Sequence, residues 1–152
     1  MSLFTIFQIS SQGMTAQRER LETAAANLAN SNTTRTEEGG PYRRRDVVFE
    51  STAIEDSNTA NSSSFGNFFD SLEQPAQGVR ATTMIAAQGE GIRRYQPDHP
   101  DADANGYVQM PDVDPLEETV NMISAARSFE ANATAFNTAK EMARASLKLG
   151  DA

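Results

Sequence analysis

The sequence predicts a mainly α protein with a small β region, in which long N- and C-terminal helices pack as a coiled-coil-like hairpin. Apolar residues of the 152-residue chain concentrate near its two ends, where they recur at helical spacing. The middle is rich in turn residues and short β-type segments. We therefore expect an N-terminal helix within residues 1–32, a loop-rich middle with a β-hairpin over 33–112, and a C-terminal helix within 113–152.

The N-terminal helix, expected over residues 3–30, carries an apolar residue at every seventh position. A seven-residue repeat keeps one narrow row facing a partner helix, as in a coiled coil. Ser10 and Gln17 interrupt the second row of that seam. A helix of roughly 40 Å cannot bury such a row against itself, so it needs a partner. The repeating residues are Phe7, Met14, Leu21 and Leu28.

The C-terminal helix has a strong start signal. Asp114 is a helix cap, Pro115 occupies the first helical position, and Glu117 completes a capping-box pattern. Two apolar rows follow. They imply that the helix has two neighbours, one of which can belong to another chain. The longer row contains Met122, Ala126, Phe129, Ala133, Phe136, Lys140, Ala143 and Leu147, and the shorter contains Leu116, Val120 and Ile123. An intramolecular hairpin core and an assembly role are both compatible with these rows.

The middle region alternates loops with candidate strands. Residues 31–40 are polar and end in Gly39-Gly40-Pro41, which predicts a loop. The polar stretch 57–64 predicts an exposed segment. Strand patterns lie over residues 46–50, 78–86, 92–95 and 107–110, the last after a tight Asn-Gly turn.

Composition and charge exclude several classes of function. The net charge of -8 and the single basic run, Arg43 to Arg45, argue against nucleic-acid binding. There is no cysteine, so disulfides and thiol chemistry are absent. No stretch approaches the ~20 apolar residues of a membrane span. The N-terminus lacks the positive region of a cleaved signal peptide, so export would leave it uncut.

No catalytic or cofactor-binding residues are predicted. The single histidine, His99, lies in a turn-rich segment without a nucleophile motif nearby. A peptidoglycan-acting enzyme is disfavoured because no catalytic constellation is present.

The alternative function is a calcium-binding interaction module. Residues 101–106 fit the pattern D-x-D-x-N-G, and Asp112 stands at the twelfth position of the loop. An Asp instead of Glu at that position, the preceding Pro111 and the strand-like flanks weaken this interpretation, and such residues also favour ordinary turns. We therefore predict no metal ligands, while the module centred on Asp101 to Asp112 stays as the runner-up.

Charge is segregated along the chain. The stretch 95–118 holds seven acidic residues and no Lys or Arg. Arg43, Arg44 and Arg45 precede it and are possible electrostatic contacts with an acidic patch on a neighbouring subunit. The alternative is that the acidic stretch and the basic run both lie on solvated faces.

Three blocks closely resemble a proximal-rod subunit of the bacterial flagellar basal body. Residues 10–17 lead into 21–34, which resembles the signature L-x-x-x-A-x-N-L-A-N-x-x-T of flagellar rod and hook proteins. Residues 95–108 resemble the segment that marks this rod subunit among its relatives. Residues 111–118 open the third block, continued at 127–132 and 136–140. One departure is Asp112, where the family pattern has Asn.

The resemblance implies a structural rod protein without an active site. It implies export through the flagellar type III apparatus, a place in the rod that crosses the periplasm, and terminal helices that surround the export channel. The implied partners are further copies, other rod proteins, the membrane-ring or rod-adaptor proteins and the export apparatus. The expected assembly residues are Phe7, Met14, Leu21, Leu28, Leu116, Val120, Met122, Ile123, Phe129, Phe136 and Leu147.

Overall fold

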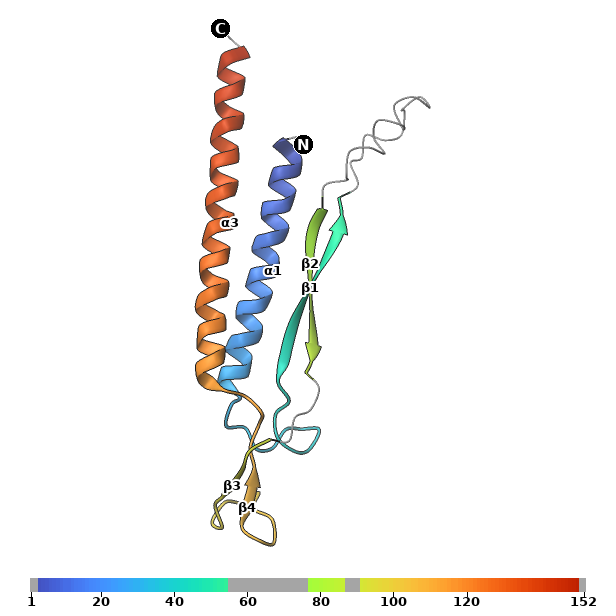
Figure 1. The fold of residues 1–152 in the computed structure, drawn as a ribbon, viewed down its shortest axis with the longest axis vertical. Coiled ribbons are helices and arrows are strands. Elements are labelled where there is room, and N and C mark those ends of the chain that lie inside the picture. The colour runs from blue at the N-terminus through green and yellow to red at the C-terminus, as the bar shows by residue number, and fades with distance from the viewer. Residues whose placement is uncertain (1–2, 55–76, 87–90, 151–152) are drawn as a thin grey trace, which may run out of the picture.

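Two antiparallel helices form the long body of the protein. The structure, a computed structural model, describes residues 3–54, 77–86 and 91–150. Helix α1 (Leu3–Ala29) lies against helix α3 (Pro115–Gly150), and the C-terminal end of α3 extends past the start of α1 (Figure 1). The predicted mainly α fold with a small β region is confirmed.

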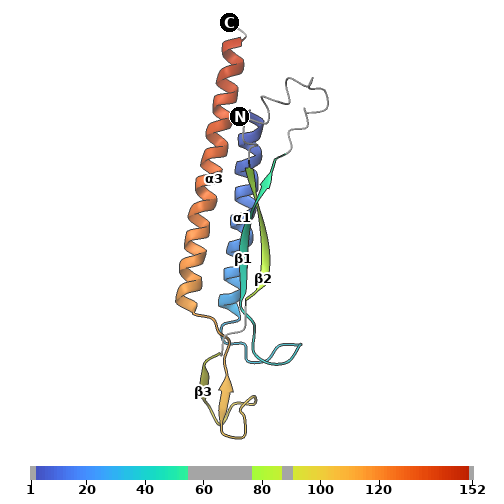
Figure 2. The same cartoon turned by 45° about the vertical axis from the view of Figure 1, so that its right-hand side comes forward.

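Two small antiparallel sheets complete the fold. Strand β1 (Arg45–Ala53) pairs with β2 (Gln77–Ile85), and this hairpin lies against α1 on the side away from α3. Strand β3 (Arg93–Tyr95) pairs with β4 (Tyr107–Gln109) to form a tip at one end of the molecule. Figure 2 shows the same order of α3, α1 and hairpin after a turn of the molecule. The predicted polar stretch 57–64 lies outside the described residues.

Small residues let the two helices approach closely. Ala24 of α1 and Ala125 and Ala139 of α3 are buried. A Cβ added at Gly13 would lie 2.9 Å from Nδ2 of Asn132, closer than unbonded atoms normally come. Larger side chains at these positions would therefore push the helices apart.

The apolar seven-residue row of α1 lies beside the centre of this contact. Phe7 packs edge-to-face on Phe136, with ring centroids 4.9 Å apart, and Met14, Leu21 and Leu28 are half-buried. Because successive residues turn about 100° around a helix, this row is displaced from the row that contains Gly13 and Ala24. The structure thus differs from a single apolar seam: small and polar residues occupy its centre and the apolar row flanks it.

Strand β2 is held to α1 by polar contacts. Oε1 of Gln12 accepts a hydrogen bond from the Val79 amide at 3.1 Å. A side chain at Gly78 would overlap the Gln12 amide, so glycine leaves room for this bond. Further along, the Thr83 hydroxyl donates to Glu19 at 3.0 Å.

Asn27 fastens the end of α1 to the start of β1. Its side chain, 1% exposed, donates from Nδ2 to the Arg45 carbonyl at 2.8 Å and accepts at Oδ1 from the Arg45 amide at 3.0 Å. The Tyr42 hydroxyl also donates to Oδ1, at 3.0 Å. The buried amide thus satisfies one backbone unit as a neighbouring strand would, and the first Asn of the N-L-A-N segment gains a structural role.

We predict that Asn27→Ala destabilises the fold by about 2–4 kcal/mol, because the Arg45 amide, the Arg45 carbonyl and the Tyr42 hydroxyl lose their partner. Urea unfolding followed by circular dichroism measures the change. The matched control is Asn32→Ala at an exposed position, expected to change stability by less than about 0.5 kcal/mol. Equal effects of the two variants would contradict the role assigned to Asn27.

Candidate assembly interface

The first turn of α3 is fixed by its cap and by an ion pair. Oδ1 of Asp114 accepts a hydrogen bond from the Leu116 amide at 2.8 Å, so the predicted cap is present. The predicted capping-box partner, Glu117, instead places its carboxylate 3.0 Å from the Arg44 guanidinium. An arginine on the neighbouring segment competes better for this carboxylate than a single backbone amide does.

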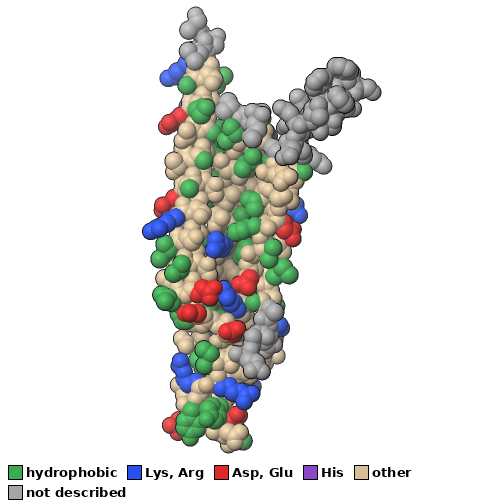
Figure 3. All heavy atoms as spheres, in the orientation of Figure 1, with side chains coloured by type: hydrophobic (Ala, Val, Ile, Leu, Met, Phe, Trp, Pro, Cys, Tyr) green, Lys and Arg blue, Asp and Glu red, His purple; other side chains and the backbone are tan. Residues whose placement is uncertain are grey.

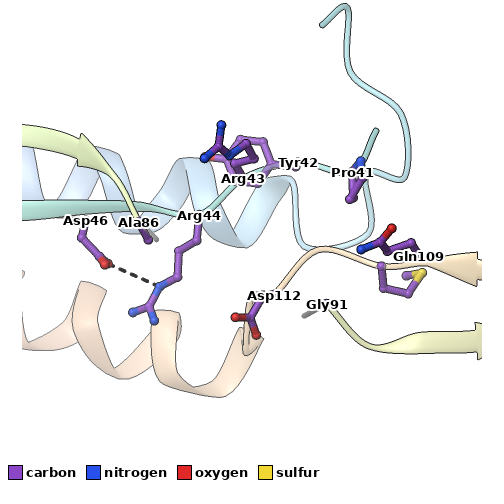
Figure 4. Close-up of a pocket in the computed structure, with 10 residues that line it drawn as sticks. Pro41, Tyr42, Arg43, Arg44, Asp46, Ala86, Gly91, Gln109 and Asp112 are labelled. Atoms are coloured by element: carbon purple, nitrogen blue, oxygen red, sulfur yellow. Dashed lines mark ion pairs between the residues drawn. The ribbon is translucent and has the colours of Figure 1, made fainter. Parts of the chain in front are cut away.

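Arg44 is the centre of a cluster of charges that joins the segment before β1 to α3. Its Nε lies 2.9 Å from Oε1 of Glu118, whose side chain is buried, and 3.4 Å from Oδ1 of Asp46. Figure 4 shows Arg44 extending towards the first turn of α3 with Asp46 beside it. Burial opposes the charge on Arg44, but the three carboxylates outweigh burial and raise its pKa above the ordinary value.

This cluster changes the interpretation of the basic run. Arg44 is engaged within the chain, whereas Arg43 and Arg45 are exposed. Of the three arginines that the sequence offers as contacts with a neighbour, only these two keep their charge fully available at the surface.

An open cavity of about 330 Å³ lies beside the cluster, where the segment before β1 meets the start of the β3–β4 tip (Figure 4). Tyr42, Arg44, Asp46, Gln109 and Asp112 are among its lining residues. No nucleophile stands beside a general base among them, so the cavity offers no catalytic arrangement.

A row of large apolar side chains on α3 faces away from the rest of the molecule. Leu116, Val120 and Ile123 are 72%, 58% and 50% exposed. Helical spacing places them opposite the buried Glu118 and Ala125, so α1 cannot cover them. Figure 3 shows hydrophobic side chains along this flank of α3. We call these three residues the α3 row.

The far end of α3 is also uncovered. Met142 and Leu147, near the C-terminal end of α3, are exposed. Phe129 is 38% exposed. The expected assembly residues therefore fall into two groups. Those half-buried are Phe7, Met14, Leu21, Leu28, Met122 and Phe136, and those mainly exposed are Leu116, Val120, Ile123, Phe129 and Leu147.

The D-x-D-x-N-G segment forms the turn of the tip. Oδ1 of Asp103 accepts hydrogen bonds from the amides of Asn105 at 2.8 Å and Tyr107 at 2.9 Å, and these bonds lower the pKa of its carboxyl, Tyr107 contributing most. Gly106 adopts the left-handed φ of 79° beneath Tyr95.

The other acidic residues of this segment are placed apart or paired. Asp101 accepts a hydrogen bond from the Thr34 hydroxyl at 2.8 Å, and Asp112 lines the cavity described above. Within the described ranges, no group of three His, Cys, Asp or Glu side chains could hold a metal ion. The pattern therefore has a structural explanation, and nothing supports the calcium-binding alternative.

The fold and its uncovered apolar rows are typical of a structural subunit that packs against other chains. The family model described as flagella basal body rod protein matches residues 7–35, and that described as flagellar basal body rod FlgEFG protein C-terminal matches residues 104–149. Proteins named flagellar basal-body rod protein FlgC are similar over nearly the whole chain. Those of Borreliella burgdorferi and Escherichia coli O6:H1 are 39% identical over 155 and 150 residues, and that of Bacillus subtilis 38% over 154.

These alignments cover 98% of both chains for Borreliella burgdorferi and 99% of both for the other two. The chain therefore belongs to the FlgC family of flagellar basal-body rod proteins, which are structural proteins and not enzymes. No helix of the described ranges is long and apolar enough to cross a membrane.

Sequence reasoning identified the α3 row but missed Asn27, Arg44 and Glu118 as the residues that hold the three elements together. A signal for Glu118 existed, since it falls on the same helical face as Met122 and Ala125. No signal in the sequence pointed to Arg44 as the partner of Glu118, because Arg44 stands inside a run of three arginines.

We predict that Arg44→Ala destabilises the fold by about 3–5 kcal/mol, because it leaves the buried Glu118 carboxylate without a counter-charge. Removing the exposed partner, as in Glu117→Ala, should cost less than about 1 kcal/mol. Chemical denaturation of the two variants measures both values. A small effect of Arg44→Ala would show that water satisfies Glu118.

We also predict that Asp103→Ala loosens the tip, because the Asn105 and Tyr107 amides lose their acceptor, whereas Asp103→Asn keeps an acceptor oxygen in the same place. Amide hydrogen exchange at these two residues is the measurement. Exchange should be faster in the Ala variant and close to the parent in the Asn variant. Equal protection in all three proteins would contradict the role given to this carboxylate.

Proposed function

We propose that this chain is a subunit of the proximal rod of the flagellar basal body and polymerises through its terminal helices. The observation that most supports this proposal is the α3 row, three large apolar side chains on the face of α3 that its own chain leaves uncovered. An aligned apolar row of this kind on one helix favours burial against another chain.

Three further surfaces support this proposal. Met142 and Leu147 are exposed near the C-terminal end of α3 and would pack on a helix of a neighbouring subunit. The row of Phe7, Met14, Leu21 and Leu28 is only half-buried, so a second chain can complete its burial. Arg43 and Arg45 are exposed and would meet carboxylates of a neighbour.

Membership of the family supports a proposal about partners and location. We propose that the rod subunit contacts further copies, other rod proteins and the ring or adaptor proteins at the membrane. It reaches the periplasm through the flagellar type III export apparatus without loss of a signal peptide, and its helices surround the export channel. Torque transmission then depends on helix packing between subunits, with no chemical step.

We predict that Val120→Asp abolishes motility in cells that depend on this chain, while the isolated protein keeps its stability within about 0.5 kcal/mol, because the side chain is exposed before assembly. Swimming in soft agar and urea unfolding of the purified variant are the two measurements.

The matched control is Thr119→Asp at the exposed neighbouring position, which lies on another side of α3. This variant should remain motile. Full motility of the Val120→Asp variant, with the chain incorporated in its basal bodies, would overturn the assembly role of the α3 row.

A further inference from the structure

The loop that joins β3 to β4 carries an open hollow at the end of the tip. The hollow has a volume of about 520 Å³, and its lining includes the rings of Tyr95, Pro97 and Pro100 and the carboxylate of Asp98. Tyr95 is 63% exposed, so the chain leaves most of its ring uncovered. Figure 3 shows hydrophobic and acidic side chains together at this end of the molecule. Such a hollow suits an apolar side chain that has a cation beside it.

Acidic residues outnumber basic ones in and around the tip. Residues 91–114 hold five aspartates and two arginines, and both arginines lie on β3, before the loop. Asp101 is bonded to the Thr34 hydroxyl, and Asp103 accepts bonds from backbone amides. Asp98 is exposed, and no ion pair joins it to another residue of the described ranges. The carboxylate at the hollow is therefore available to a partner.

The opposite end of the molecule carries the opposite net charge. Figure 1 places the C-terminal end of α3 there, at the far end of the long axis from the tip. Residues 3–17 of α1, which lie beside this part of α3, contain no charged residue. Residues 131–148 contain one acidic residue, Glu141, and three exposed basic residues, which are Lys140, Arg144 and Lys148. Asp151 lies outside the described residues. Two copies stacked along the long axis in the same orientation would therefore bring opposite charges together.

An uncovered apolar side chain stands among these bases. Leu147 is 72% exposed. Lys140, Arg144 and Leu147 follow one another at spacings of four and three, so they share one face of α3. This face offers an apolar side chain with a cation one turn away, which is the chemistry that the hollow suits.

We propose that the C-terminal end of α3 of one copy docks in the hollow at the tip of a second copy, stacked beyond it in the same orientation. Leu147 packs on Tyr95 and Pro97, and Arg144 meets Asp98. The inference rests on the proposed function, and it adds a contact along the long axis to the contacts that the α3 row makes on the flank.

The two surfaces of this contact differ, so the contact is heterologous. After one copy has bound another, a tip remains free at one end of the pair and an α3 end at the other. Such a contact continues into a longer assembly instead of ending at a dimer. It therefore suits a tube that extends along the long axis of its subunits.

Cysteine cross-linking tests the contact, because the natural chain has no cysteine. The full chain with Pro97→Cys and Leu147→Cys is produced in cells that depend on it for motility, and their purified basal bodies are oxidised with copper–phenanthroline in air. The tip and the C-terminal end of α3 lie at opposite ends of one molecule, so a disulfide between them must join two copies (Figure 1). Dimers and longer products are expected on a non-reducing gel.

The controls use the same gel. Each single-cysteine variant should stay monomeric, and dimers of Pro97→Cys alone would show that two tips meet and would overturn the contact. Pro97→Cys with Asn137→Cys, ten residues and about 15 Å before Leu147 on α3, should give no product. Equal yields from the two pairs overturn the contact. So does the absence of product with Leu147→Cys in basal bodies that contain the chain.

A photo-activated benzophenone attached to Pro97→Cys identifies whatever lies in the hollow. The expected product is a dimer of this chain, joined within residues 140–148 as read by mass spectrometry. A product with any other protein of the basal body would show that a different subunit fills the hollow, and it would overturn the second copy as the occupant.

A charge exchange tests the ion pair of the contact. Asp98→Arg sets like charges against each other and should lower the yield of the Pro97→Cys, Leu147→Cys dimer at least about fivefold. Adding Arg144→Asp restores opposite charges, and the yield should return. Glu37→Arg, the same change of charge at an exposed residue of another loop, should keep the yield within about twofold.

Motility in soft agar should follow the same order in chains without introduced cysteine, so the outcome does not depend on the cysteine variants. An equal loss with Glu37→Arg, or no recovery after the double exchange in a chain that folds normally by circular dichroism, contradicts the contact.

Failure of the proposed function gives a different result. The unmodified chain would then be absent from purified basal bodies on an immunoblot, and this contact would fall with it. A chain that is present there but gives none of these products overturns the contact along the long axis alone, and the role of the α3 row stands.

Discussion

The position of α1 between α3 and the β-hairpin constrains everything else in this protein. One side of α1 approaches α3 through small residues such as Gly13 and Ala24, and another holds β2 and β1 through the amides of Gln12 and Asn27. A helix that is occupied on two sides cannot also cover the far faces of its neighbours. The α3 row is therefore exposed as a geometric consequence of this arrangement.

Polar side chains, more than apolar ones, fix how the layers are arranged. Asn27 binds both backbone groups of Arg45, and Arg44 binds carboxylates from the first turn of α3. Such contacts are directional, whereas alanine surfaces slide over one another at little cost. The segment 42–46 consequently sets the relative height of hairpin and helix.

Much of this fold could be predicted from the sequence, and the failures have physical causes. Asp114 and Pro115 marked the start of α3 because capping is a local property. The local sequence also predicted that Glu117 completes a capping box with Asp114. Its partner in the structure is instead Arg44, which is distant in sequence. The α3 row was identified because helical spacing reveals a second apolar face, whereas the neighbour that would cover it depends on the fold of another chain.

The D-x-D-x-N-G segment shows how one pattern can serve two chemistries. Calcium loops need several carboxylates that converge on one point, but a turn needs only one, aimed at successive backbone amides. Asp103 satisfies the second requirement, and Gly106 supplies the backbone conformation that brings Tyr107 back towards Tyr95, 5.3 Å away between ring centroids. Because Asp101 is bonded to Thr34 after α1, the tip is tied to the helical body. Acidic residues that suggested an ion site thus shape the tip and fix its position relative to α1.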